Sequence, residues 1–168
     1  MGIKLRSLAL LTLLALLFSL VACGERSYEH CEIGIRLGSD FSEYDSDGRF
    51  DMSYSDGRVV IGVLRFSFEA CLKGDIPITM SDYTFAKYYR NRAGEIENVT
   101  EVALHGYLPY FSYTLTGEGN VEYRYVATFY TTPNAYFLVM YITPESILQK
   151  TRGEISELIE KVYFKAIF

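Results

Sequence analysis

The sequence Tyr136-Phe137-Leu138-Val139-Met140-Tyr141-Ile142 has no polar side when the chain is extended. Successive side chains of a strand point to opposite faces of a sheet, so a strand that is apolar at both alternating sets of positions is covered on both faces. We therefore expect residues 136–142 to form the strand at the centre of a sheet, with other layers on both sides of it.

A meander of strands leads into this central segment. The pattern predicts strands over 110–116 and 121–131, joined by a loop over 117–120. Pro133-Asn134 is then the turn that leads into the central segment. Residues 99–104 are a further candidate strand. Strands joined by such short connections pair in antiparallel fashion, so the sheet is expected to be mostly antiparallel.

The first part of the chain also reads as strands. Ile33, Ile35 and Leu37 alternate with other residues and predict a half-buried strand. A near-repeat follows, in which Tyr44-Asp45-Ser46-Asp47-Gly48-Arg49 is echoed by Tyr54-Ser55-Asp56-Gly57-Arg58. Asp-Gly in a two-residue loop tolerates the positive φ angles of a type I′ turn, so both stretches predict β-hairpins.

The strands around these turns follow from the same alternation. Phe50, Met52 and Tyr54 alternate with polar residues between the two turns, which predicts that they share one face. The strand from Val59 to about Phe68 is apolar on both sides in its first half, so we expect it next to the centre of the sheet.

A first helix is predicted in the middle of the chain. Ser81 is a suitable helix cap, and the helix runs to about Arg92. Its inner stripe consists of Phe85, Tyr88 and Tyr89.

A second helix is predicted near the C-terminus. Thr143-Pro144-Glu145 opens a helical turn with proline in the first helical position. Thr151 and Glu154 then form a capping box for the last helix. We expect its inner face to hold four apolar residues: Ile155, Leu158, Ile159 and Val162. Together the elements predict an α+β domain, in which a mostly antiparallel sheet of five or six strands carries helices on its faces.

The N-terminus has the pattern of an export signal. Lys4 and Arg6 precede an apolar run, and the run ends in Leu20-Val21-Ala22-Cys23. This ending resembles the lipobox of bacterial lipoproteins, in which the cysteine thiol is acylated, for example with palmitate, and the signal is cut before it. The resemblance implies a signal peptide over 1–22. The remaining 146 residues have the length of one domain, so we expect a short tether over 23–30 and a single domain over 31–168. An uncleaved anchor and a plain secreted protein are the alternatives.

Charge and composition restrict the partners. The chain has 16 basic and 21 acidic residues, and loss of Lys4 and Arg6 with the signal leaves 14 basic residues and a formal charge of −7. Phosphate backbones are repelled by such a chain, so we expect no nucleic-acid partner. The 15 tyrosines and the absence of tryptophan fit a tyrosine-rich sheet, with a recognition surface for sugar or peptide as the alternative.

The order of elements is similar to that of the PsbP-like superfamily. Ile33, Ile35, Leu37 and Phe41 resemble its opening strand, although Gly38 stands where the family commonly has proline. The superfamily includes an extrinsic subunit of photosystem II, a Ran-binding nuclear-import cofactor and many bacterial lipoproteins. The resemblance implies a layered fold that docks onto other proteins and has no shared catalytic residues.

Two cysteines remain after the lipidation residue. Cys31 and Cys71 could form a disulfide in an exported protein, or both could stay reduced. Together with His30 and His105 they are the only soft metal ligands of the mature chain, and their spacing matches no compact zinc pattern.

Calcium is the other metal to consider. Asp45, Asp47 and Asp51 fall on ligand positions of an EF-hand loop, but Tyr54 occupies the place that needs a bidentate glutamate. The Asp-Gly turns explain the same residues without a metal, so we expect no metal and no other cofactor.

No catalytic motif is visible in the sequence. Gly-x-Ser-x-Gly, His-Glu-x-x-His and Cys-x-x-Cys are all absent. We therefore expect a lipid-anchored, extracytoplasmic module of the cell envelope that binds a partner protein or a ligand, with the hairpin tips at Asp47-Gly48 and Asp56-Gly57 as rims of its binding face. The alternatives are a carboxylate- or metal-dependent enzyme, which a pocket joining two acids with His105 would favour, and a passive surface protein.

Overall fold

The computed structural model describes residues 26–30, 32–92, 96 and 98–165, with the backbone alone for 26–30. The segment 1–22, Cys23 and Cys31 lie outside these residues. Among the described residues, no helix combines the length and apolar character that crossing a membrane requires.

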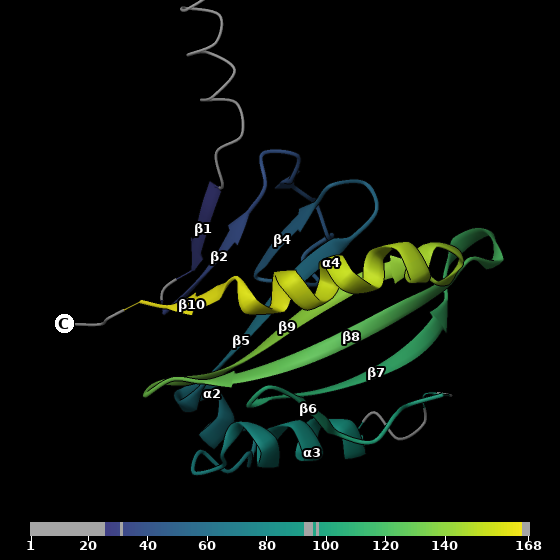
Figure 1. Ribbon diagram of the computed structural model, residues 1–168. Coiled ribbons are helices and arrows are strands. Elements are labelled where there is room, and N and C mark those ends of the chain that lie inside the picture. The colour runs from purple at the N-terminus through teal and green to yellow at the C-terminus, as the bar shows by residue number, and fades with distance from the viewer. Residues whose placement is uncertain (1–25, 31, 93–95, 97, 166–168) are drawn as a thin grey trace, which may run out of the picture.

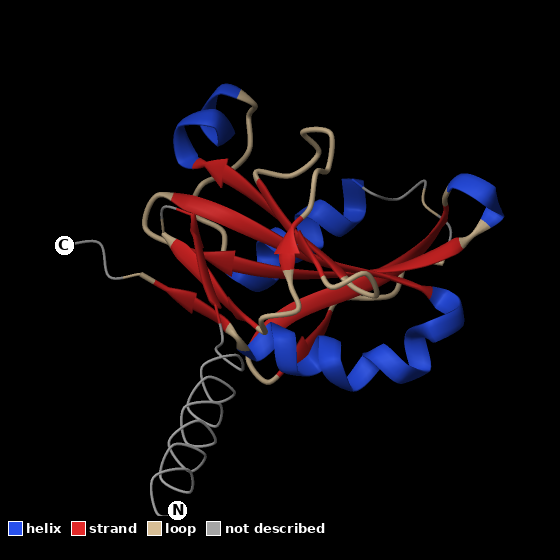
Figure 2. Ribbon diagram, turned by 90° about the horizontal axis from the view of Figure 1, so that it is seen from above, coloured by secondary structure: helices blue, strands red, loops and turns tan. Residues whose placement is uncertain are grey.

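A seven-stranded antiparallel sheet forms the body of the molecule (Figure 1). Its strands lie in this spatial order: β3 (Ser42–Glu43), β4 (Met52–Ser55), β5 (Val60–Ser67), β9 (Ala135–Pro144), β8 (Glu122–Thr131), β7 (Leu108–Thr116) and β6 (Ala103–His105). β9, which contains the apolar stretch 136–142, is the middle strand, as the sequence predicts. Seen from above, the strands cross the molecule as a twisted layer (Figure 2).

The two sides of β9 contribute to two separate cores. Phe137, Val139 and Tyr141 pack into the first core, and Tyr136, Leu138 and Met140 pack into the second. All six are buried, so the central strand is covered on both faces. The α+β layered fold predicted from the sequence is confirmed, but the main sheet has seven strands instead of the predicted five or six, and three more strands form a separate small sheet.

One face of the sheet is covered by a small sheet and a helix. The small sheet has the order β1 (Arg26–His30), β2 (Ile33–Leu37) and β10 (Val162–Phe164), and both pairings are antiparallel. A short 3₁₀ turn, η2 (Glu145–Ile147), leads into α4 (Leu148–Glu160). The apolar residues of β2 and α4 complete the first core. Figure 1 shows α4 crossing this face of the sheet.

Helices α2 (Phe68–Lys73) and α3 (Asp82–Arg92) lie against the opposite face (Figure 1). Ser81 accepts a hydrogen bond at 3.3 Å from the Thr84 N–H, so it caps α3 as predicted. Phe85 stacks on Tyr136 with ring centroids 4.2 Å apart and meets Phe129 edge-on at 5.7 Å. The second core is therefore largely aromatic. The turn η1 (Glu118–Asn120) joins β7 to β8.

The two Asp-Gly turns differ. Asp47 and Gly48 both have positive φ angles, 52° and 72°, and the Arg49 N–H bonds to the Ser46 carbonyl at 3.1 Å, which is the predicted type I′ geometry. In the second turn only Gly57 has a positive φ, 85°, so that turn is of another type. Its shape is set by Asp56, whose carboxylate accepts two backbone hydrogen bonds.

Three local predictions about the C-terminal part of the chain are wrong. The last helix begins at Leu148, so Thr151 lies inside it, buried, and does not form a capping box. Pro144 ends β9 and precedes the first residue of η2. Val162 belongs to β10 rather than to the last helix, because pairing with β2 takes over after Glu160.

Two further segments differ from their predicted roles. Residues 26–30, expected to be part of the tether, pair with β2 as strand β1. Phe50 precedes β4 and packs into the second core, whereas Met52 and Tyr54 pack into the first. The space for the Phe50 ring comes from Gly62, where an added Cβ would lie 2.6 Å from ring atoms.

Candidate functional site

A groove runs beside α4 on the face of the sheet that this helix covers. α4 forms one wall and β6, β7 and β8 form the other, and side chains from both walls meet at the floor of a space of about 480 Å³. This volume lies within the usual range for small-ligand sites. We call it the α4 groove.

The side chains that line the groove come from one face of the strands and from one face of α4. Tyr110 and Ser112 of β7 and Arg124 and Val126 of β8 point to the α4 side, because residues two apart share a face. On α4 the lining residues recur at three- and four-residue intervals: Leu148, Gln149, Arg152, Ile155, Ser156 and Ile159.

The bottom of the α4 groove is apolar. Ile155 and Ile159 are each 4% exposed and belong to the first core, and Val126 packs against that core from the sheet side. A ligand with an apolar part therefore finds surface there that is already shielded from water on its inner side.

The charged side chains of the groove differ in their pairing. Arg124 donates two hydrogen bonds to the Glu145 carboxylate, at 3.0 and 3.1 Å. Glu101 accepts from Arg90 at 2.6 Å. Arg152, the third charged residue of the lining, forms no ion pair with any residue that the structure describes.

His105 lies at the end of the groove nearest the C-terminal end of α4. Its Nε2 is 3.5 Å from Ser156 Oγ and 3.5 Å from a carboxylate oxygen of Glu160. A Ser-His-acid catalyst uses the two ring nitrogens separately, one for the hydroxyl and the other for the acid. Here the same nitrogen faces both groups, so the three residues do not have the geometry of a catalytic triad.

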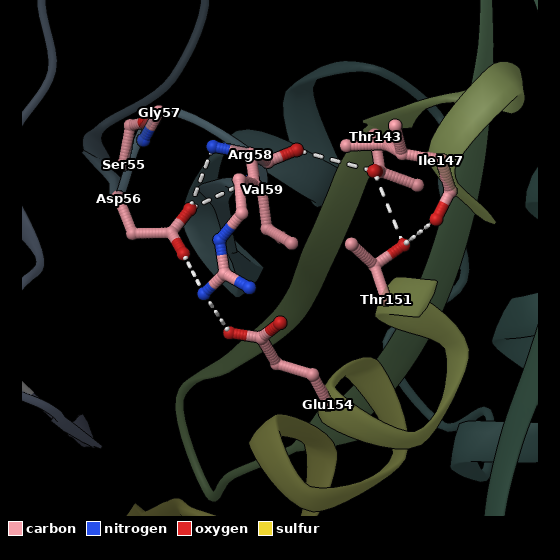
Figure 3. A network of polar contacts seen from close by, with 9 residues as sticks. All are labelled: Ser55, Asp56, Gly57, Arg58, Val59, Thr143, Ile147, Thr151 and Glu154. Carbon is pink, nitrogen blue, oxygen red and sulfur yellow. Dashed lines mark hydrogen bonds and ion pairs between the residues drawn. The ribbon is translucent and has the colours of Figure 1, made fainter. Parts of the chain in front are cut away.

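The opposite side of α4 is fixed to the protein by a network of polar contacts (Figure 3). Arg58, in the turn between β4 and β5, bonds to Asp56 at 2.6 Å and to Glu154 of α4 at 2.9 Å. Thr143 of β9 donates to the Arg58 carbonyl at 3.1 Å, and its hydroxyl oxygen lies 3.3 Å from that of Thr151. We call this the braced side of α4.

The carboxyl groups of the braced side respond to their surroundings in opposite ways. Burial opposes the charge on Asp56, but hydrogen bonds from Val59 and Arg58 outweigh burial and hold the pKa of Asp56 below its usual value. Burial raises the pKa of Glu154, although Arg58 works against the increase. Asp56 is thus the firmly ionised member of the network.

Glu32 is a buried acid that sequence reasoning missed. Its side chain accepts from Thr132 at 2.6 Å and from Asn134 at 3.0 Å, and Arg65 lies 3.5 Å away. Burial opposes its charge, but these partners outweigh burial and lower the pKa of Glu32. The residue ties the start of β2 to the β8–β9 turn and to β5, which is a structural role.

The calcium candidates do not form a common ligand shell. Asp45 accepts from the Asp47 N–H at 2.9 Å, and Asp51 accepts from the Arg65 N–H at 2.6 Å. No group of three or more His, Cys, Asp or Glu residues in the described part of the chain is arranged to hold a metal ion. These carboxylates shape the hairpins.

The cysteine predictions fall partly outside the described residues. Cys71 is buried in the second core, and burial raises the pKa of its thiol. Cys31 and the lipidation residue Cys23 lie outside the described residues, as does the side chain of His30. The pairing of Cys31 with Cys71 and the acylation of Cys23 therefore stay predictions.

A second cavity of about 330 Å³ lies under α3 and is lined mainly by aromatic residues, among them Phe66, Phe85 and Tyr88. It also touches Ile96, whose neighbours 93–95 and 97 lie outside the described residues. The α4 groove is the better defined candidate site.

Sequence comparison finds no relative: no protein-family model matches the chain, and no curated protein matches it.

Structure comparison finds similar folds. Cyanobacterial PsbP (CyanoP) from Synechocystis superposes with a TM-score of 0.52 at 14% identity, covering 85% of this chain and 94% of that one. LpqN, described as involved in cell envelope biogenesis of Mycobacterium tuberculosis, superposes with a TM-score of 0.50 at 7% identity, covering 84% and 91%.

A protein from Bacteroides thetaiotaomicron gives a TM-score of 0.55 at 14% identity, covering 85% of this chain. The chain spans about half the length of that protein, 49%. The fold is therefore PsbP-like, as the order of elements suggests.

Proposed function

We propose that this protein is a lipid-anchored, extracytoplasmic binding module of the cell envelope, and that its ligand binds in the α4 groove. The observation that carries the proposal is the groove itself, in which an apolar floor and Arg152, which has no ion-pair partner among the described residues, line one cavity beside a firmly held helix.

Binding accounts for the groove better than catalysis does. Among the described residues that line the groove, Glu101 is the only acid, and it is engaged by Arg90; His105 faces Ser156 and Glu160 through one nitrogen. A pocket that joins two acids with His105 would favour an enzyme. The described lining residues do not form such a pocket. A cavity of mixed polar and apolar lining is the usual form of a ligand site.

Two observations support a location of the protein outside the cytoplasm. The ending Leu20-Val21-Ala22-Cys23 resembles a lipobox, and LpqN, one of the proteins with this fold, is described as acting in cell envelope biogenesis. Acyl chains on Cys23 would hold the protein at the membrane by burying about 0.8 kcal/mol per methylene.

The anchor can be tested by mass spectrometry of the mature N-terminus. We expect an acylated peptide that begins at Cys23, and we expect the Cys23→Ser variant to lose the acyl mass and leave the membrane fraction. A full-length chain that still begins at Met1 and is found in the cytosol would refute this half of the proposal.

The binding half can be tested by blocking the groove. Ser156→Trp places a large ring in the groove, whereas Glu157→Trp adds the same ring at an exposed position of α4 outside the lining. We expect tagged wild-type protein and the Glu157→Trp variant to retain the same small molecule or protein segment from solubilised membranes, and the Ser156→Trp variant to lose it. Equal retention by all three would show that the groove is not the binding site.

A further inference from the structure

The charges of the α4 groove leave one unbalanced cation. Arg124 is neutralised by Glu145 through two hydrogen bonds, and Glu101 is neutralised by Arg90. Arg152 remains without an ion-pair partner among the described residues. The chain as a whole carries a formal charge of −5, so this unpaired guanidinium lies on a protein that is otherwise acidic.

Hydrogen-bonding groups line the same cavity as this cation. Gln149 and Ser156 share the α4 wall with Arg152, and Ser112 lines the opposite wall on β7. An amide and two hydroxyls can donate hydrogen bonds to the oxygens of an anion whose charge a guanidinium holds.

The apolar floor restricts what the remainder of the ligand can be. Val126, Ile155 and Ile159 offer a contact surface beside the charged wall, within a total volume of about 480 Å³. That space suits a small molecule with a short apolar body, and a free inorganic anion would leave the floor without a partner.

We propose that the α4 groove selects a small organic anion, whose carboxylate or phosphate group is bound by Arg152 and whose apolar body lies on Val126, Ile155 and Ile159. The inference rests on the proposed function and deepens it, because it specifies the chemistry of the ligand. Charge complementarity with Arg152 and the position of the apolar floor in the same cavity carry it.

Calorimetric titration of the full-length protein in lipid nanodiscs tests the inference, with empty nanodiscs as the blank. Four probes separate the contributions: hexanoate and hexyl phosphate carry both parts, 1-hexanol carries only the apolar body, and inorganic phosphate carries only the charge. We expect each amphipathic anion to bind at least about 10-fold more tightly than 1-hexanol, the difference that a charge-assisted hydrogen bond gives. We expect a difference of at least about 10-fold from inorganic phosphate as well, because inorganic phosphate has no apolar body to bury on the floor.

A matched pair of variants assigns the selectivity to one residue. Arg152→Gln removes the charge from the groove, while Lys150→Gln removes an equal charge from an exposed position of the same helix that does not line the groove. We expect Arg152→Gln to weaken hexanoate about 10-fold and leave 1-hexanol unchanged. Lys150→Gln should change neither by more than about 2-fold.

The outcomes distinguish this inference from the proposed function. Equal binding of hexanoate and 1-hexanol would overturn the assignment of an anionic ligand. An equal loss of hexanoate affinity in the Arg152→Gln and Lys150→Gln variants would do the same. Neither result would contradict the proposal that some ligand binds in the groove. Absence of binding by all four probes would also overturn the assignment of an anionic ligand, and the Ser156→Trp experiment would still decide whether the groove binds another ligand. Tight binding of inorganic phosphate alone would refute the role of the apolar floor.

Discussion

The two long sides of α4 are built in opposite ways. On the braced side, Thr151 and Glu154 meet β9 and the β4–β5 turn through hydrogen bonds and an ion pair. On the groove side and among the described residues, Arg152 has no ion pair, and the Ser156 hydroxyl has one hydrogen-bond contact, with His105 Nε2 at 3.5 Å. One helix thus carries a stripe that fixes it and a stripe that is free to contact a ligand.

This difference explains how the protein combines rigidity with an open surface. Residues of α4 that differ by one position, such as Thr151 and Arg152, lie about 100° apart around the helix and so belong to different sides. Contacts that fix the helix can therefore be made without occupying the groove. A site whose walls are held by contacts elsewhere loses little conformational entropy when a ligand binds.

The largest expected effect comes from removing the core contact below the braced side. Leu158 is 4% exposed and packs in the first core, so Leu158→Ala should lower the free energy of unfolding by about 3 kcal/mol. Chemical denaturation followed by circular dichroism measures it. A loss below about 1 kcal/mol would mean that α4 is not anchored through this side chain.

Removing the ionised acid of the braced side should have the next largest effect. Asp56 accepts hydrogen bonds from the Arg58 and Val59 N–H groups, both at 2.8 Å, so we expect Asp56→Ala to cost about 2 kcal/mol at pH 6. Because the folded pKa of Asp56 lies below the usual 3.8, its stabilisation is complete above that pH and is lost as the pH falls through the folded pKa.

The difference between wild-type protein and the Asp56→Ala variant should therefore shrink as the pH is lowered below about 3.8. Urea unfolding at pH 6, 4 and 2.5 measures this. A difference that stays constant over the series would mean that the Asp56 charge does not contribute to the brace.

A smaller effect is expected from the buried hydroxyl pair. Thr151→Val keeps the shape of the side chain but removes the contact with Thr143 and the bond to the Ile147 carbonyl, at 3.3 Å each. We expect a loss of about 1 kcal/mol, with a matching loss in Thr143→Val and a non-additive double variant. Strictly additive losses would show that the two hydroxyls do not interact.

The smallest effects should come from the groove side. Gln149→Ala and Arg152→Gln remove exposed side chains that form no hydrogen bond or ion pair with the described residues, so each should change the free energy of unfolding by less than about 0.5 kcal/mol. Thermal unfolding in the absence of ligand measures this. A large destabilisation by either variant would mean that the groove residues serve the fold and would remove the contrast between the two sides.

Much of the fold could be predicted because its signals are local. Residues 136–142 are apolar on both sides, and the central position of β9 follows from that pattern alone. The Ser81 cap and the Asp47-Gly48 turn are also local, since each depends on hydrogen bonds within four residues.

The errors occur where a distant partner decides the outcome. Thr151 has the spacing of a capping box, but η2 runs directly into α4, and the hydroxyl is then buried against Thr143 of β9. Val162 fits the helical stripe, yet pairing with Ile35 of β2 draws it into a strand.

The α4 groove could not be predicted for the same reason. Its lining comes from one helix and three strands, so Arg152 and Val126 are neighbours of one cavity although 26 positions of sequence separate them. The tertiary structure brings these residues together, so the spacing of residues within a single helix or strand does not predict the site. The hairpin tips at Asp47-Gly48 and Asp56-Gly57, expected as rims, do not line this groove.

Strand β1 limits how far the folded domain can lie from Cys23. Because the fold takes up the backbone from Arg26 onward, only Gly24 and Glu25 separate Cys23 from it, and two or three extended residues span roughly 10 Å. If Cys23 is acylated as proposed, this short connection would hold the domain close to the bilayer surface. Whatever occupies the groove must then come to the bilayer surface, so the protein samples a thin, nearly two-dimensional zone.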